Sequence, residues 1–192
     1  APNAQRVSVV GDFNHWDGRV HAMRKMFPSG IWEIFVPHVQ EGAHYKIEIR
    51  GPHDGLMLKT DPFAFFAQHG TQTGCMVYDI TRYGWNDADW IEQRKHRDQY
   101  NSPMSTYEVH LGSWQRNPVE RNRFLSYIEL GDRLIPYVKE LSFTHIELLP
   151  VMEHPFDGSW GYQVVNFYAP TSRHGNPDEF RNFVDRCHQA GI

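Results

Sequence analysis

The sequence predicts two domains of different class: an Ig-like β-sandwich with a linker over residues 1–101, and an α/β domain over residues 102–192. Three observations support this prediction. Short strand-like runs separated by turn residues recur through residues 6–80, a pattern typical of a sandwich. Residues 81–103 are polar and charged and end at a proline, as linkers do. After that proline, strand-like and helical patterns alternate, which indicates parallel strands covered by helices.

The first region contains several short runs with the composition of strands. In the clearest of them, YKIEIR, apolar and polar side chains alternate. The turn sequence GPHDG after this run predicts a hairpin to the next one, and Pro37 ends the run that precedes it. The predicted strands are residues 6–10, 31–36, 45–50, 56–59 and 76–80.

The linker is predicted to contain one short helix, because residues 86–90, NDADW, offer an N-cap. The second region is then expected to run strand, helix, strand. Residues 106–111 and 144–149 read as strands, and residues 124–141 as a helix with apolar side chains at helical spacing. Pro136 is expected to kink that helix.

A further helix is clearly signalled near the end of the sequence. Asn176 is its predicted N-cap, followed by Pro177 at the first helical position and Glu179 at the third. Gly191 is its predicted C-cap. A parallel pair of strands with two helices leaves an exposed sheet edge, so we expect the chain to end before its sheet is complete.

Composition excludes several classes of function. A formal net charge of −4 argues against nucleic acid as a partner, and no run of about 18 apolar residues predicts a membrane span. Cys75 and Cys187 are expected to be free thiols in a cytoplasmic protein. The sequence has 12 histidines but no zinc-binding motif, so neither a metal nor a cofactor is expected. Aromatic residues make up 14%, and exposed rings suit flat, neutral ligands such as sugars.

The stretch MEHPFDGSWGYQVVNFYAPTSRHG, residues 152–175, has neither helical nor strand period. It follows a predicted strand of an α/β domain, which is where ligand-binding loops occur. Trp160 and Tyr162 are candidate ligand-binding residues, and Gly158 and Gly161 would let the backbone approach a ligand. The alternative is that both rings pack the loop onto the sheet.

Two carboxylates of this stretch, Glu153 and Asp157, suggest glycoside hydrolysis, which needs a pair of acids. Their closeness in sequence does not set their distance in space. Loop acids more often cap turns or hold neighbours, so a structural role is favoured for both.

In the first region, Trp16 lies in a predicted turn and is flanked by His15 and Asp17. A partly exposed tryptophan beside polar groups suits sugar stacking, with a simple turn plug as the alternative. Phe13 of the same turn is expected in the core. Lys46 has the outward parity of its strand and is expected in solvent, unless Trp16 is its neighbour.

Three motifs carry a resemblance to a known family. They are GDFNHWDG at residues 11–18, YEVHLGSW at residues 107–114, and FTHIELLPVMEHPFDGSWGYQ at residues 143–163. With them the chain resembles bacterial 1,4-α-glucan (glycogen) branching enzymes of glycoside hydrolase family 13 over essentially its whole length. The resemblance implies a carbohydrate-binding module of family 48 followed by the first βα units of a (β/α)8 TIM barrel.

The resemblance also implies site residues and a partner. Tyr162 would line the subsite beside the broken bond, while Trp16 and Lys46 match positions that hold glucan in related modules. A second tryptophan of those modules has no counterpart at residues 55–58. The implied partner is an α-glucan such as glycogen or a maltooligosaccharide, in a glycosyltransferase of glycogen biosynthesis.

The implied mechanism is retaining, with an aspartate nucleophile, a glutamate acid and base, and a second aspartate that stabilises the transition state. The resemblance places all three beyond Ile192. No catalytic residue is therefore expected in this chain, and the fragment by itself is expected to be inactive. Two alternatives stay open: a debranching or maltooligosyltrehalose-releasing relative, and a non-catalytic glucan-binding protein. The stretch HPFDGSWGYQ favours branching.

Overall fold

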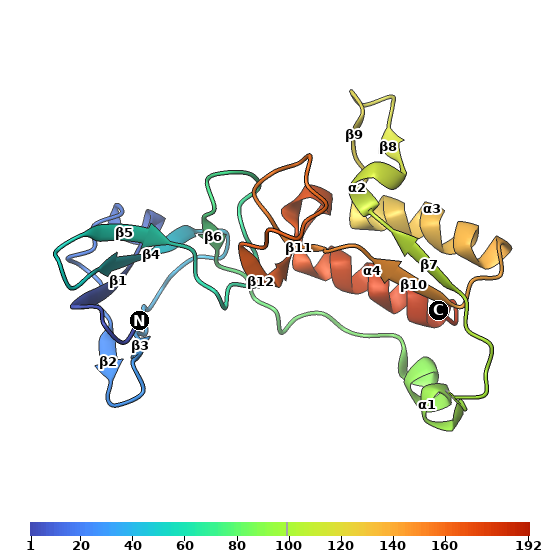
Figure 1. Ribbon diagram of the computed structural model, residues 1–192, viewed down its shortest axis with the longest axis horizontal. Coiled ribbons are helices and arrows are strands. Elements are labelled where there is room, and N and C mark those ends of the chain that lie inside the picture. Colours follow the sequence, from blue (N-terminus) through green and yellow to red (C-terminus); the bar gives the residue numbers. More distant parts are fainter. Residues whose placement is uncertain (99) are drawn as a thin grey trace.

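A computed structural model describes residues 1–98 and 100–192. The chain forms an elongated molecule with two halves at opposite ends of its long axis (Figure 1). The β-rich half comprises residues 1–80 and contains the N-terminus, and the mixed half comprises residues 102–192 and contains the C-terminus. The predicted change of class along the chain is therefore seen in the structure.

The β-rich half is built on a four-stranded antiparallel sheet. Strand β4 (His44–Arg50) lies at its centre and pairs with β1 (Arg6–Gly11), β5 (Leu56–Lys59) and β6 (Cys75–Met76). Strand β1 buries three valines, Val7, Val9 and Val10. Because successive side chains of a strand point to opposite faces, burial of both Val9 and Val10 means that both faces of β1 are covered. The predicted β-rich first region is confirmed.

Two predicted strands are shorter than expected. The run 31–36 pairs only as β3 (Ile31–Glu33), in a hairpin with β2 (Arg24–Met26). Phe35 is 87% exposed, and Pro37 has no N–H to donate, so the run leaves the ladder early. The run 76–80 contributes only Met76 to β6, because β4 begins at His44 and offers no further partner.

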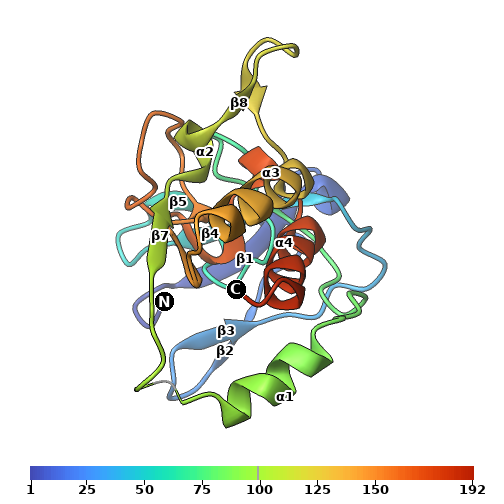
Figure 2. The same ribbon diagram turned by 90° about the vertical axis from the view of Figure 1, so that its right-hand side faces the viewer.

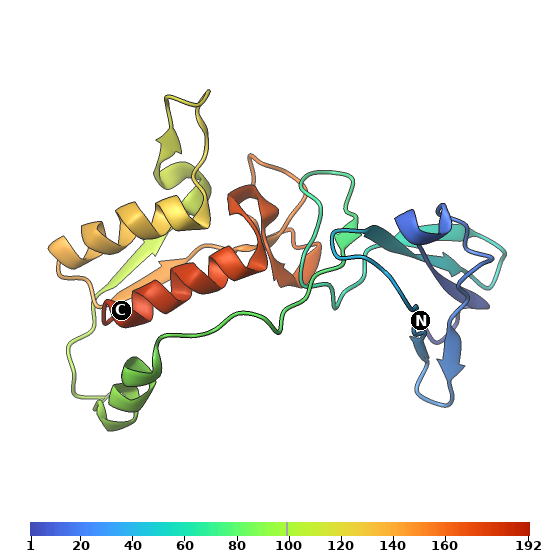
Figure 3. The ribbon, with the colours of Figure 1, turned by 180° about the vertical axis from the view of Figure 1, so that it is seen from behind.

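The linker runs extended along α4 (Pro177–Gln189) before it forms the predicted helix, α1 (Ala88–His96) (Figure 3). His188 of α4 attaches this helix: its Nδ1 lies 2.6 Å from Asp87 Oδ2, and its ring stacks on Trp90 at 3.8 Å. Gln99, which belongs to the predicted linker, lies outside the described residues.

The mixed half contains a parallel pair of strands, β7 (Thr106–Val109) and β10 (His145–Leu148). Helices α3 (Tyr127–Glu140) and α4 lie side by side against them (Figure 2). Their shared core is apolar and fully or nearly fully buried, and it includes Val109, Leu111, Leu125, Tyr127, Leu130, Leu134, Ile135, Val138, Phe183 and Cys187. The short α2 (Leu111–Trp114) and the hairpin of β8 (Arg116–Asn117) and β9 (Arg123–Phe124) stand between β7 and α3.

Local signals explain where the helices begin. Helix α3 starts at Tyr127 rather than at the predicted residue 124, because Ser126 caps it and exchanges hydrogen bonds with Glu129. Helix α4 begins as predicted, with Asn176 and Glu179 forming the same reciprocal cap. Its C-cap is Ala190, and the predicted cap Gly191 is the next residue, at φ +81°.

The stretch of residues 152–175 is less irregular than its sequence indicates. It contains a short antiparallel pair, β11 (Met152–Glu153) with β12 (Asn166–Pro170), and a 3-10 turn at Ser172–His174. Residues 154–165 form the excursion between the two strands, hereafter the aromatic loop. The prediction that the whole stretch lacks strands is wrong. The paired segments are too short to show an alternation of apolar and polar residues in the sequence.

Candidate functional site

The first candidate region is the turn that follows β1. Residues Asp12–Asn14 form a 3-10 turn, and Trp16 has φ 61°, with its backbone N–H bonded to Gly11 O at 3.1 Å. The indole Nε1 donates to Asp12 Oδ1 at 3.2 Å, while the ring is 41% exposed. Trp16 is partly exposed, as predicted, and its orientation is fixed by a local hydrogen bond. Phe13 is only half-buried, since it packs against His21 at the edge of the turn.

Asp12 is itself held in place by the central strand. Its Oδ2 accepts a hydrogen bond from the backbone N–H of His44 at 2.8 Å and lies 3.2 Å from the His44 ring. The backbone hydrogen bond from His44 lowers the pKa of Asp12. The carboxylate therefore stays charged and continues to accept the hydrogen bond from Trp16 Nε1. In the sequence, Asp12 looks like an ordinary turn residue and gives no sign of this role.

Trp16 and Lys46 line one surface pocket of about 370 Å³. The pocket also includes Leu58 of β5 and two amide side chains, Gln68 and Gln72, from the loop before β6. Lys46 is therefore a neighbour of Trp16, which was the condition for a role beyond a solvated strand face. An aromatic ring, an apolar side chain and several hydrogen-bonding groups together suit a neutral polyhydroxylated ligand.

The second candidate region is the aromatic loop in the mixed half. Trp160 and Tyr162 are each 68% exposed. Both rings are therefore largely unpacked in this chain. The structure does not bring them into the pocket of Trp16, because they lie on the other half of the molecule.

The two glycines of the aromatic loop serve the packing of the loop itself. Gly161 has φ +91°, and a Cβ there would lie 2.6 Å from Pro150 O. A Cβ on Gly158 would lie 2.9 Å from the ring of Phe156. The predicted reason for these glycines, close approach of a ligand, is not needed to explain them.

A buried ion pair holds the base of the aromatic loop. Glu153 is 3% exposed and its side chain accepts hydrogen bonds from Thr171 Oγ1 at 3.1 Å, Ser172 N at 2.7 Å and Arg173 Nη1 at 2.7 Å. Burial of a charge is costly unless it is paired and hydrogen-bonded. Glu153 meets both conditions, whereas Nη2 of Arg173 is buried without a hydrogen-bond partner. This arrangement supports the structural role favoured for Glu153.

Arg173 extends the network to Asp157. The guanidinium is 2% exposed, and its Nε donates to Asp157 Oδ1 at 2.7 Å. Burial raises the pKa of Asp157, but the hydrogen bond from His69 and the charge of Arg173 outweigh it and hold the pKa below its usual value. Asp157 therefore also has a structural role, as favoured from the sequence.

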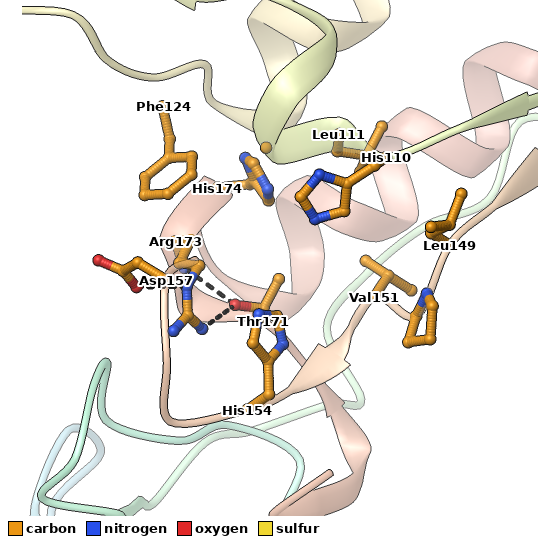
Figure 4. A pocket seen from close by; sticks show the side chains of 12 residues that line it. His110, Leu111, Phe124, Leu149, Val151, His154, Asp157, Thr171, Arg173 and His174 are labelled. Atoms are coloured by element: carbon orange, nitrogen blue, oxygen red, sulfur yellow. Dashed lines mark hydrogen bonds and ion pairs between the residues drawn. The ribbon is translucent and has the colours of Figure 1, made fainter. Parts of the chain in front are cut away.

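Three histidines surround a small cavity of about 20 Å³ beside this network (Figure 4). His174 is buried, its Nδ1 donates to Leu125 O at 2.7 Å, and burial lowers its pKa to about 4. Burial also lowers the pKa of His110, with the charges of His154 and Arg116 acting in the same direction. All three line the cavity, whose size leaves room for about one water molecule.

Other expectations can be compared with the described part of the chain. Cys75 and Cys187 are free and buried, as predicted. Among residues 1–98 and 100–192, no three histidine, cysteine or acidic side chains come together as metal ligands would. Within those same ranges, no helix has both the length and the apolar composition that crossing a membrane requires.

Sequence reasoning missed several residues that build the two regions. Arg173, Gln68 and Gln72 occur in polar loops where they resemble solvated side chains. No spacing rule marks them, because Glu153 is 20 residues from Arg173 and the pocket partners of the two glutamines lie on other elements. A buried arginine is exceptional enough that only a three-dimensional arrangement reveals it.

Comparison with known sequences confirms the resemblance. Residues 1–64 match the model of carbohydrate-binding module 48, described as the isoamylase N-terminal domain. The whole chain is 58% identical over 193 residues to a 1,4-alpha-glucan branching enzyme of Gloeobacter violaceus, and it covers 26% of that protein. It is 57% identical over 194 residues to the branching enzyme of Rhodospirillum rubrum, again covering 26%. The chain thus spans about a quarter of the length of these curated relatives.

Two solved structures share the fold of the chain. A putative alpha amylase from Salmonella typhimurium matches all of the chain with a TM-score of 0.74 and 26% identity, and 29% of that structure is covered. A pullulanase from Anoxybacillus, solved with maltotetraose, matches with a TM-score of 0.71 and 19% identity over 31% of its length. The second similarity is informative about the fold alone.

Proposed function

We propose that the chain serves in a 1,4-alpha-glucan branching enzyme, to which it contributes a glucan-binding module and part of the rim of the substrate-binding site. The 58% identity over the full chain to a curated branching enzyme is the observation that carries the proposal. The identity to the pullulanase structure is only 19% and that to the amylase structure 26%. Both values are well below 58%, which favours branching over the debranching alternative.

The proposal includes a division of the chain. Residues 1–101 would form an Ig-like β-sandwich with its linker, and residues 102–192 the first βα units of a (β/α)8 barrel. The parallel register of β7 and β10, with α3 between them in sequence, supports the barrel assignment. The catalytic acids would lie beyond residue 192. Glu153 and Asp157 are engaged with Arg173, so the proposal gives neither of them a catalytic role.

In the module, the pocket of Trp16 is the proposed anchor for an α-glucan. The exposed face of the indole would stack on the C–H face of a glucose ring, and Asp12 fixes its angle. Lys46, Gln68 and Gln72 supply donors and acceptors for sugar hydroxyls. Such an anchor would raise the local concentration of chain ends near the catalytic site.

In the mixed half, Tyr162 and Trp160 are the proposed contacts on the rim of the active site. Both rings face solvent from a loop whose base is held by the buried network, and this loop lies a few residues beyond the carboxyl end of the parallel strand β10. A phenol can stack on a sugar and bond to a hydroxyl, which suits binding beside the bond that is broken. The chemistry itself would belong to carboxylates outside this chain.

The test is isothermal calorimetry of the 192-residue chain with maltoheptaose and with cellohexaose. We expect binding of the α-linked oligosaccharide and no measurable binding of the β-linked one. Equal binding of both sugars, or of neither, would contradict glucan recognition by the module. Formation of α-1,6 branches from amylose by the whole protein is the corresponding test of the activity.

A further inference from the structure

We propose that His69 is a positioning residue that connects the pocket of Trp16 to the aromatic loop, so that a glucan held in the pocket also orders the loop of Trp160 and Tyr162. This inference rests on the proposed function, because it needs a glucan in the pocket. It assigns a role to a contact between the two halves of the molecule.

His69 lies in a loop of the β-rich half, residues 67–74, hereafter the bridging loop. The base of this loop is fixed: Ala67 is fully buried and forms a β-bridge with Cys75. The tip is open, with His69 and Gln72 both exposed. Because the base is held and the tip is exposed, a ligand that contacts the tip can order it without moving the sheet.

One side of the bridging loop faces the pocket. Gln68 and Gln72 line it together with Trp16 and Lys46. Each amide can donate to and accept from sugar hydroxyls, so a bound glucan would hold both side chains. His69 lies between these two glutamines and directly follows Gln68 in the chain. A glucan that fixes Gln68 and Gln72 would therefore also restrict the backbone at His69.

The other side of the bridging loop touches the aromatic loop. His69 Nε2 donates to Asp157 Oδ1 at 2.8 Å, and the same oxygen accepts from Arg173 Nε at 2.7 Å. Arg173 is locked in the buried network, and Figure 4 shows it beside Asp157. Asp157 precedes Trp160 and Tyr162 by only a few residues. His69 thus reaches the aromatic loop next to the atoms that anchor it.

The halves are also joined by a buried contact that a ligand cannot adjust. Asn166 of β12 is fully buried, and its amide donates to Thr60 Oγ1 and to Asp61 O, each at 2.9 Å. By contrast, the side chains of His69 and Asp157 are 46% and 52% exposed. The buried contact sets the distance between the halves, and the exposed one is weak enough for ligand binding to strengthen it.

The expected effect is modest. An exposed charged hydrogen bond of this kind changes an equilibrium by about two- to fivefold. In hydrogen–deuterium exchange followed by mass spectrometry, maltoheptaose should slow exchange in residues 67–74 and also in residues 154–163 by about this factor. The experiment uses the complete 192-residue chain.

Two variants of His69 test whether the effect of the glucan on the aromatic loop passes through this side chain. In His69→Ala, the slowing at residues 67–74 should persist, while the slowing at residues 154–163 should disappear. In His69→Gln, the side-chain amide can still donate to Asp157, and the effect on the aromatic loop should return. His53→Ala is the matched control, since His53 is an exposed histidine on another loop of the same half.

The outcomes separate this inference from the proposed function. If residues 154–163 remain protected in His69→Ala, the glucan touches the aromatic loop directly and His69 has no positioning role. If the unaltered chain shows protection at residues 67–74 alone, the inference is wrong and the glucan pocket stands. If maltoheptaose protects neither segment, the proposed glucan-binding function fails and this inference fails with it.

Discussion

The two aromatic regions of this molecule are exposed in similar ways but are supported differently. Trp16 is held by bonds to Gly11 and Asp12, which lie within five residues of it, on a sheet whose ladder fixes the rest of the pocket. Trp160 and Tyr162 have no such local support. Their loop depends on Arg173, a residue on the far side of β12, which binds Glu153 and Asp157 at its base.

The difference shows two ways to place a ring in solvent. A sheet provides a rigid surface through regular backbone bonds, so a short local motif is enough. An irregular loop has no ladder, and a buried ion pair supplies the rigidity instead. The second solution is more fragile, because loss of one charge leaves the other one buried and unpaired. Four variants, taken from the largest expected effect to the smallest, test this comparison.

The largest effect is expected for Arg173→Met. The substitution leaves Glu153, which is 3% exposed, without its cation, and we expect the free energy of unfolding to fall by about 3–5 kcal/mol. Urea denaturation followed by circular dichroism measures it. Arg19→Ala is the control, since Arg19 is 83% exposed in its pair with Asp17 and its loss should leave the stability nearly unchanged. Equal losses in the two variants would show that the buried network does not hold the loop.

The second prediction concerns pH and the same loop base. Burial lowers the pKa of His174 from 6.5 to about 4, so between these values the unfolded chain binds a proton that the folded chain does not. The free energy of unfolding should therefore fall as the pH decreases from 6.5 to 4, by at most about 3 kcal/mol from this group.

Urea titrations at several pH values test the prediction about His174. His174→Gln keeps a donor for Leu125 O but cannot titrate, and its stability should vary less over this range. His15→Gln, at an exposed histidine of the other half, should keep the full dependence. A slope that is the same in all three proteins would assign the acid sensitivity to other groups.

The third prediction tests the sheet-based region. Trp16→Ala should weaken maltoheptaose binding by about 1–3 kcal/mol, the usual cost of losing a stacking ring, without loss of stability beyond about 1 kcal/mol. Calorimetry measures the affinity. Trp85→Ala is the control, because Trp85 is 49% exposed in the linker and lies outside the pocket. An unchanged affinity in Trp16→Ala removes this ring from the binding site.

The smallest effect is expected for Tyr162→Phe, which removes one hydroxyl and keeps the ring. In the whole protein we expect the KM for amylose to rise about two- to tenfold, the consequence of losing one hydrogen bond of about 0.5–1.5 kcal/mol. Tyr100→Phe, at a tyrosine that is 98% exposed, should have no effect. If both variants behave alike, the hydroxyl of Tyr162 does not contact the substrate.

Elements with a strong local signal could be predicted from the sequence. The hairpin between β4 and β5 and the start of α4 were correctly placed, because a turn sequence and a capping motif mark them. The start of α3 was placed three residues early, although Ser126 and Glu129 offered the same capping signal. The short pair of β11 and β12 was missed, since its paired segments are too short to show an alternation of apolar and polar residues.

For the candidate site, too, some features could be predicted from the sequence and others could not. The exposure of Trp16 could be predicted, and its proximity to Lys46 could be stated only as a condition that the pocket then fulfilled. The rings of the aromatic loop were identified as candidates, but the reason that the loop is rigid was not. Arg173 gives no sign in the sequence that its side chain is 2% exposed.

By itself, the sequence determined the β-rich class of the first half and most caps and turns, and it supplied candidate residues for sugar binding, because these follow from interactions among near neighbours along the chain. Only the tertiary structure decided that Gln68 and Gln72 join the pocket of Trp16, and that Arg173 holds the aromatic loop. Those arrangements depend on burial and on charges brought together from distant elements. A hydrogen bond or ion pair gains its strength from the low-dielectric surroundings that folding creates, and no local pattern records it.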